Sequence, residues 1–149
     1  MKLTEATLKM ARIAGMDYSE AANYMTNAVR SFKMEMEDAS HVTDVYSALA
    51  AKSASSSAEL AQAMSKTASS AEAVGSSFEN TTAMMAVMIE ATREAPENIG
   101  SAMKSIISRY GELKTNPAAL TDSEGEELSL NKVDTALKSV GITLKNSEG

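Results

Sequence analysis

The chain contains one histidine, His41, and the carboxylates Glu37, Asp38 and Asp44 stand close to it in the sequence. A metal site here would take its other ligands from these carboxylates alone, because the chain has no cysteine. Acidic residues near the start of a helix ordinarily serve the helix dipole instead. We therefore predict an exposed helical histidine and no metal-binding residue.

Serine, histidine and aspartate together could also form a hydrolase triad. The sequence has no strained nucleophile turn of the G-x-S-x-G kind and no strand to carry one. Glu35, Glu37 and Asp38 could act as an acid and base pair, but they form an unprotected run that is typical of a solvated face. The glycines near Ser76 lack the spacing of a phosphate-binding loop. We predict no catalytic residue, no cofactor-binding residue and no enzyme.

Composition narrows the possible functions further. The net charge is −6, and the 14 basic residues are scattered singly among 20 acidic ones, so nucleic-acid binding is not expected. The longest apolar run, Ala83 to Ile89, is far too short to span a bilayer, and we expect no membrane contact by this segment. The first residues, Met1 to Glu5, lack the hydrophobic core of a signal peptide.

The pattern of caps and breaks predicts an all-α bundle of about six short helices. The first helix runs from about Leu3 to Ala14 and ends at Gly15, which tolerates the left-handed conformation. The next five are expected to begin at capping residues. These caps are Asp17, Asp38, Ser56 with Glu59, Ser77, and Asn98 after the break at Pro96.

Apolar residues at helical spacing predict which face of each helix is buried. The expected stripes are Tyr18, Ala21, Ala22, Met25, Ala28, Val29 and Phe32; Val42, Val45, Tyr46 and Leu49; Leu60, Met64, Ala68, Ala71 and Val74; Phe78, Met85, Met88 and Ile89; and Ile99, Met103, Ile106, Tyr110 and Leu113. The fifth helix is apolar all round through Met84 and Val87. We expect it to lie centrally in the bundle, the alternative being an adaptable contact surface for other copies or an assembly chaperone.

One segment occurs twice, sixty positions apart. Gly15-Met16-Asp17-Tyr18 and Gly75-Ser76-Ser77-Phe78 share the order of helix stop, cap and aromatic residue. A tandem helical unit favours a structural role over a single catalytic cleft. We predict a helical core over residues 1–116, with repeat units of about 1–56 and 57–116. Residues 117–149 are predicted to be an acidic linker and a short C-terminal helix, 132–140, flexible or truncated, with a brief strand at 142–144.

Several segments, in this order, resemble the core region of phage tail tape measure proteins. They are Ala14 to Asp17, Ala48 to Met64, Ala73 to Thr81, Ile106 to Arg109 and Ala136 to Ile142. Glu94 to Asn98, where the family has a more glycine-rich connection, and the long linker Leu113 to Leu130 depart from the family pattern.

The resemblance implies a non-enzymatic virion protein of a tailed phage or prophage, here as a module of a longer chain. Such proteins occupy the tail tube, take part in tail assembly, set tail length and leave at genome ejection. The implied partners are other copies of the chain, tail tube proteins and tail assembly chaperones, with assembly in the bacterial cytoplasm. The alternatives are a helical binding or signalling module and a membrane-active segment acting at ejection.

Overall fold

The structure is a computed structural model that describes residues 2–115, with side chains described through residue 111. The described residues form helices joined by short connections and contain no strand, which confirms the predicted all-α class. The elements are α1 (Lys2–Ala14), α2 (Tyr18–Ser31), the 3₁₀ turn η1 (Met36–Asp38), α3 (Ala39–Ala50), α4 (Ser57–Ala73), α5 (Phe78–Thr92) and α6 (Pro96–Thr115). The predicted C-terminal linker, helix and strand lie outside the described residues.

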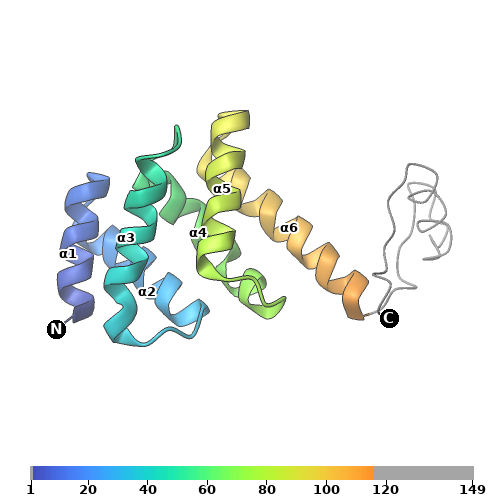
Figure 1. Cartoon of the computed structure of the whole chain (residues 1–149), viewed down its shortest axis with the longest axis horizontal. Coiled ribbons are helices and arrows are strands. Elements are labelled where there is room, and N and C mark those ends of the chain that lie inside the picture. Colours follow the sequence, from blue (N-terminus) through green and yellow to red (C-terminus); the bar gives the residue numbers. More distant parts are fainter. Residues whose placement is uncertain (1, 116–149) are drawn as a thin grey trace. The chain divides into compact units, whose positions relative to one another are not determined.

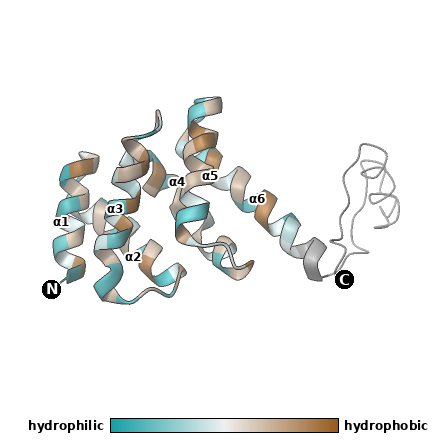
Figure 2. Ribbon diagram, in the orientation of Figure 1, coloured by the Kyte–Doolittle hydropathy of each residue, from teal (hydrophilic) through white to brown (hydrophobic). Residues whose placement is uncertain are grey.

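Among the described residues, 2–107 form one compact unit. Helix α1 packs against α2 and α3, while α4 packs against both α2 and α5. Helix α3 also contacts α4 and α5, so the chain reverses direction repeatedly (Figure 1). Hydrophobic and hydrophilic residues alternate along the helices, as amphipathic helices around a shared core require (Figure 2).

Two of the connections are built in the same way. Gly15 and Gly75 have φ angles of 66° and 81°, a region that favours glycine, and each ends a helix. The side chain of Asp17 then accepts the Glu20 N–H at 2.9 Å to start α2, and Ser77 Oγ accepts the Asn80 N–H at 3.2 Å to start α5. Each cap satisfies a backbone donor that the first turn leaves free.

A second pair of backbone positions follows the same sixty-residue spacing. Lys33 and Arg93, also sixty residues apart, adopt φ angles of 53° and 58°. Among the described residues, these two and the two glycines are the positions with positive φ. The unit of α1 to α3 is therefore repeated by α4 to α6 in its turns as well as in its helices. The elements that correspond are α1 and α4, α2 and α5, and α3 and α6.

Two of the five predicted helix caps are wrong, and the other three, including Asp17 at α2, are confirmed. Asp38 ends the 3₁₀ turn and makes no side-chain cap, since that turn already leads the backbone into α3. Helix α6 begins at Pro96 rather than after Asn98, because proline suits the first helical position, where its missing N–H is not needed. At α4, Ser56 and Glu59 form the predicted capping box, and Ser77 caps α5 as expected.

The core consists largely of alanine, methionine and a few large side chains. The fully buried large residues include Tyr46, Phe78, Met10, Met25, Leu60, Met64, Met85, Ile89, Val29 and Val42. Alanines such as Ala21, Ala63 and Ala68 are also buried, and they allow the helices to approach closely. Small side chains therefore set the spacing of the helices, while methionines fill the gaps between them.

Some predicted stripe positions are wrong in an informative way. Tyr18 is 46% exposed, and Ile106 and Tyr110 are also exposed, while Ile107 is buried in place of Ile106. Helix α5 is not central, since Met84 and Val87 on its outer side face solvent. The side chain of Leu113 lies outside the described residues.

Helices α4 and α6 approach each other closely at Gly100. A side chain at Gly100 would run into the backbone carbonyl of Ala63 and would lie 2.9 Å from the Lys66 Cβ. Thr67 Oγ1 donates a hydrogen bond of 2.7 Å to the Gly100 carbonyl oxygen. This contact fixes the start of α6 against α4 and buries Ile99 and Met103.

Candidate functional site: the interface between the repeat units

The side chains singled out for metal binding are dispersed by the fold. His41 Nε2 lies 2.5 Å from the Glu79 carboxylate on α5, and Lys9 donates to Asp44 at 2.7 Å. Glu37 lies on η1 and makes no metal cluster with them. Over residues 2–111, no three histidine or acidic side chains come together in a way that could hold an ion.

Hydrogen bonds of the serines are local and structural. Ser56 and Ser77 cap helices, while Ser47 and Ser105 donate to carbonyl oxygens of the preceding helical turn. In the part of the chain that the structure describes, no serine hydroxyl hydrogen-bonds His41. The arrangement lacks the contact between nucleophile and base on which covalent catalysis depends.

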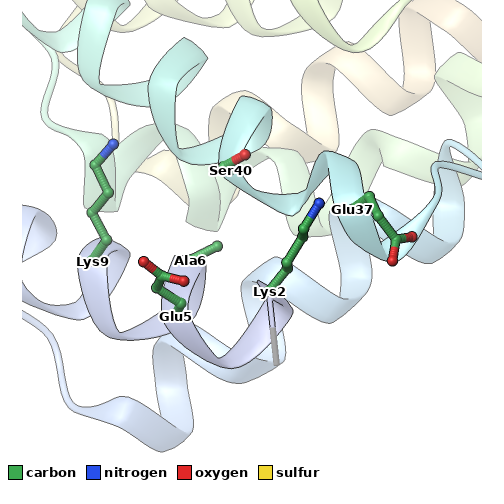
Figure 3. Close-up of a pocket in the computed structure, with 6 residues that line it drawn as sticks. All are labelled: Lys2, Glu5, Ala6, Lys9, Glu37 and Ser40. Atoms are coloured by element: carbon green, nitrogen blue, oxygen red, sulfur yellow. The ribbon is translucent and has the colours of Figure 1, made fainter.

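A shallow hollow of about 320 Å³ lies between α1 and the start of α3. Figure 3 shows Lys2, Glu5 and Lys9 rising from α1, with Glu37 and Ser40 on the opposite side. Two lysines and two glutamates leave the lining without net charge. The hollow therefore offers no defined recognition chemistry for a phosphate, a cation or an apolar ligand.

A cluster of aromatic rings joins the two repeat units. Phe78, the first residue of α5, packs edge to face against Phe32 and Tyr46 of the first unit, with ring centroids 5.5 and 5.2 Å apart. Phe78 is 1% exposed and Tyr46 is fully buried. Edge-to-face packing adds stability beyond the area it buries. We call this contact of α2 and α3 with α4 and α5 the unit interface.

Polar pairs surround this aromatic cluster. Lys33 Nζ lies 2.6 Å from Glu72 at the end of α4, and His41 pairs with Glu79 at the start of α5. The hydrogen bond with His41 is the main cause that lowers the pKa of Glu79 below its ordinary value of 4.5. Arg93 donates to the Ala54 carbonyl at 3.0 Å across the same boundary. These side chains are exposed, so each pair contributes little stability but fixes the register of the two units.

Two buried polar atoms of the first unit, Asn27 Oδ1 and the Tyr46 hydroxyl, lack a hydrogen-bond partner among the described residues. The Tyr46 hydroxyl is buried and makes no hydrogen bond with the described residues, and burial raises its pKa strongly. Its ring provides the packing surface for Phe78, whereas its hydroxyl costs free energy. Nothing in the sequence marks this group, because helical periodicity indicates a buried tyrosine but not where its hydroxyl ends.

The described helices include none that is long and apolar enough to cross a bilayer. The model of the family described as "Phage-related minor tail protein" matches residues 1–149. The chain is also 26% identical over 158 aligned residues to the tape measure protein of Pneumococcus phage Dp-1. That alignment covers 99% of this chain and 14% of the phage protein, so the chain spans about one seventh of its relative's length. No solved structure matches.

Proposed function

Since the chain belongs to the phage-related minor tail protein family, we propose that it is a folded module of a tape measure protein. As a member of this family it is a structural component of a phage tail. The observation that carries the finer proposal is the alignment of nearly the whole chain with one segment of a named tape measure protein. We infer that the parent protein takes part in tail assembly, in tail length determination and in genome ejection.

The internal geometry supports a structural role without catalysis. Ser56 and Ser77 are engaged in helix caps, and His41, the single histidine, pairs with a glutamate of another helix. The buried aromatic rings of Phe78 and Tyr46 pack against each other at the junction of the two repeat units. A molecule arranged in this way is suited to holding helices in register.

The same geometry separates this module from the length-measuring part that we propose for its parent. A ruler segment would be a long helix that gains about 1.5 Å per residue. The longest described helix, α6, has 20 residues and would span about 30 Å. Within residues 1–107 the chain folds back at Gly15 and Gly75 instead of extending. We propose that this module serves assembly or ejection, while helical regions elsewhere in the parent set the length.

The proposed partners are other copies of the chain, tail tube proteins and a tail assembly chaperone. The proposed location is the tail of the virion, after assembly in the cytoplasm of the bacterial host. An exposed methionine and valine, Met84 and Val87 on α5, offer an apolar surface for such partners. No direct contact with nucleic acid is proposed, since the net charge is −6.

Particles of the encoding phage provide the test. Mass spectrometry of purified virions should detect peptides from residues 2–107 together with tail tube peptides. A Phe78→Ala change in the parent gene should lower the yield of infectious particles, because it disrupts the unit interface. Ser70→Ala, a small change on α4 outside the aromatic cluster, is the matched control and should leave the yield unchanged. Absence of these peptides from tails, or equal yields from both variants, would contradict the proposal.

A further inference from the structure

The repeat predicts which surfaces should be covered at the two ends of the unit. In the middle of the molecule, the first unit presents α2 and α3, and the second unit covers them with α4 and α5. By the same sixty-residue correspondence, α5 and α6 present an equivalent surface at one end. At the other end, α1 and α2 correspond to α4 and α5, the two helices that cover the first unit.

The covering surface at the beginning of the chain is apolar and exposed. Tyr18 corresponds to Phe78, which is 1% exposed, yet Tyr18 itself is 46% exposed. Leu8 is 51% exposed, whereas its counterpart Ala68 on α4 is buried. Both are large apolar residues, and their counterparts in the second unit, Ala68 and Phe78, are buried. We call Leu8 and Tyr18 the head surface.

The surface at the other end shows the opposite half of the same contact. Ile106 on α6 corresponds to the fully buried Tyr46 but is 58% exposed. Met84 and Val87 on α5, at 42% and 66% exposure, correspond to Tyr24 and Asn27 of α2, which are both partly buried. We call Met84, Val87 and Ile106 the tail surface. The repeat thus accounts for most of the large apolar side chains left in solvent.

We propose that the head surface of one copy binds the tail surface of a second copy. Tyr18 of the first copy would pack on Ile106 of the second as Phe78 packs on Tyr46 within the chain. The occupant is a second copy because this chain already shows both halves of the contact joined to each other in the unit interface. This inference depends on the repeat geometry and stands or falls separately from the proposed tail role.

Charge at the two ends is complementary. Helix α1 carries Lys2, Lys9 and Arg12 against Glu5, a net charge of +2. In the unit interface Glu72 pairs with Lys33. Arg12 corresponds to Glu72 and Arg93 to Lys33, so Arg12 should lie near Arg93 of the second copy. The segment 90–97 around Arg93 contains three glutamates and no other basic residue, a net charge of −2. Arg12 is positively charged where its counterpart Glu72 is negative. The glutamates around Arg93 provide the negative charge that Arg12 would meet.

A contact between two different surfaces leaves one head surface and one tail surface free in every complex that does not close into a ring. Such heterologous contacts form rings when the rotation closes and open chains when it does not. Adding copies should therefore give a series of sizes rather than one dimer. This feature separates the proposal from a symmetric contact, in which a single surface meets itself.

Sedimentation equilibrium of the 149-residue chain tests the proposal. The weight-average mass should rise from the 15.7 kDa monomer to beyond the dimer across roughly 10 μM to 1 mM, the range of a weak interface. Tyr18→Asp and Val87→Asp should each abolish this rise, since each blocks one surface. Ile13→Asp is the matched control, because Ile13 is 46% exposed on α1 and its counterpart Ala73 is exposed as well.

Mixing the two blocked chains gives the sharpest outcome. The Tyr18→Asp chain keeps its tail surface and the Val87→Asp chain keeps its head surface. Together they should form a complex of two chains that does not grow further, and far-ultraviolet circular dichroism of each variant should match the parent. A monomer at all concentrations, a rise that persists in either variant, or a mixture that stays monomeric while the unmixed parent associates would overturn the proposal.

Discussion

Replacing Phe78 with alanine is expected to cost more stability than any other single truncation of an aromatic residue in the described unit. Phe78 is 1% exposed and contacts Phe32 and Tyr46 edge to face. Truncating a buried phenylalanine typically costs about 3–5 kcal/mol through lost burial and the cavity that remains. The two ring contacts place the expected loss in the upper part of this range.

The repeat supplies a matched control for this change. Tyr18 occupies the corresponding position in the first unit and is 46% exposed, so Tyr18→Ala should cost less than about 1 kcal/mol. For a chain of this size, about 1 kcal/mol shifts the melting temperature by roughly 2–4 °C. Phe78→Ala should therefore lower it by about 6–20 °C, and Tyr18→Ala by a few degrees at most.

Thermal and urea unfolding, followed by circular dichroism at a low concentration of protein, measure both variants. Low concentration matters because association of copies would add stability that depends on Tyr18. Losses of similar size at Phe78 and Tyr18 would refute the reasoning, since the two positions would then be equally buried. A loss below about 1 kcal/mol at Phe78 would show that the unit interface does not hold the two units together.

Three further changes test other contacts by equilibrium unfolding. Gly100→Ala should destabilise the protein by about 1–3 kcal/mol, although alanine favours helices, because the new methyl group meets the Ala63 carbonyl; a gain in stability would contradict this close approach. Tyr46→Phe should be neutral or stabilising by about 1 kcal/mol, since it removes a buried hydroxyl without a partner; a clear loss would indicate that the hydroxyl is satisfied. Glu79→Gln should cost less than about 1 kcal/mol at neutral pH, because the pair with His41 is exposed. The pKa of Glu79 is lowered in the folded state. The difference in unfolding free energy between the parent and Glu79→Gln should therefore be complete above about pH 4.5 and disappear as the pH falls through the lower pKa of the folded state. A difference that persists in acid would contradict the pairing.

Local signals in the sequence predicted the connections well. Gly15 and Gly75 were expected to end helices, and both adopt positive φ angles there. The capping box of Ser56 and Glu59 follows from short-range chemistry and is present. Such features depend on a few neighbouring residues, and therefore the sequence contains all the information needed to find them.

Burial was harder to predict where it depends on a neighbouring unit. Helical spacing marks Tyr18 and Phe78 as equivalent, but within residues 2–111 only Phe78 packs against aromatic rings of the other unit. Ile106 and Val87 are likewise exposed, whereas their counterparts in the first unit, Tyr46 and Asn27, are buried and partly buried. A sequence pattern shows which face of a helix is apolar, whereas contact with a neighbouring repeat unit determines whether that face is buried.

The functional assignment came from the order of segments rather than from a reactive site. The sequence predicted no catalytic, cofactor-binding or metal-binding residue, and these absences stay predictions. His41 is by residue type a possible metal ligand, but its described partner is Glu79 at the rim of the unit interface. Neither periodicity nor spacing indicated this pair, because the two residues belong to different repeat units.

We propose that this segment is a folded module of a tape measure protein and not a part of the helical region that sets tail length. Deleting residues 1–149 in frame from the encoding gene and measuring tails by electron microscopy tests it directly. As ruler, 149 residues would account for about 220 Å at 1.5 Å per residue. We expect few or defective tails, with any that form close to their normal length. Intact, infectious particles with tails shorter by about 220 Å would contradict the claim.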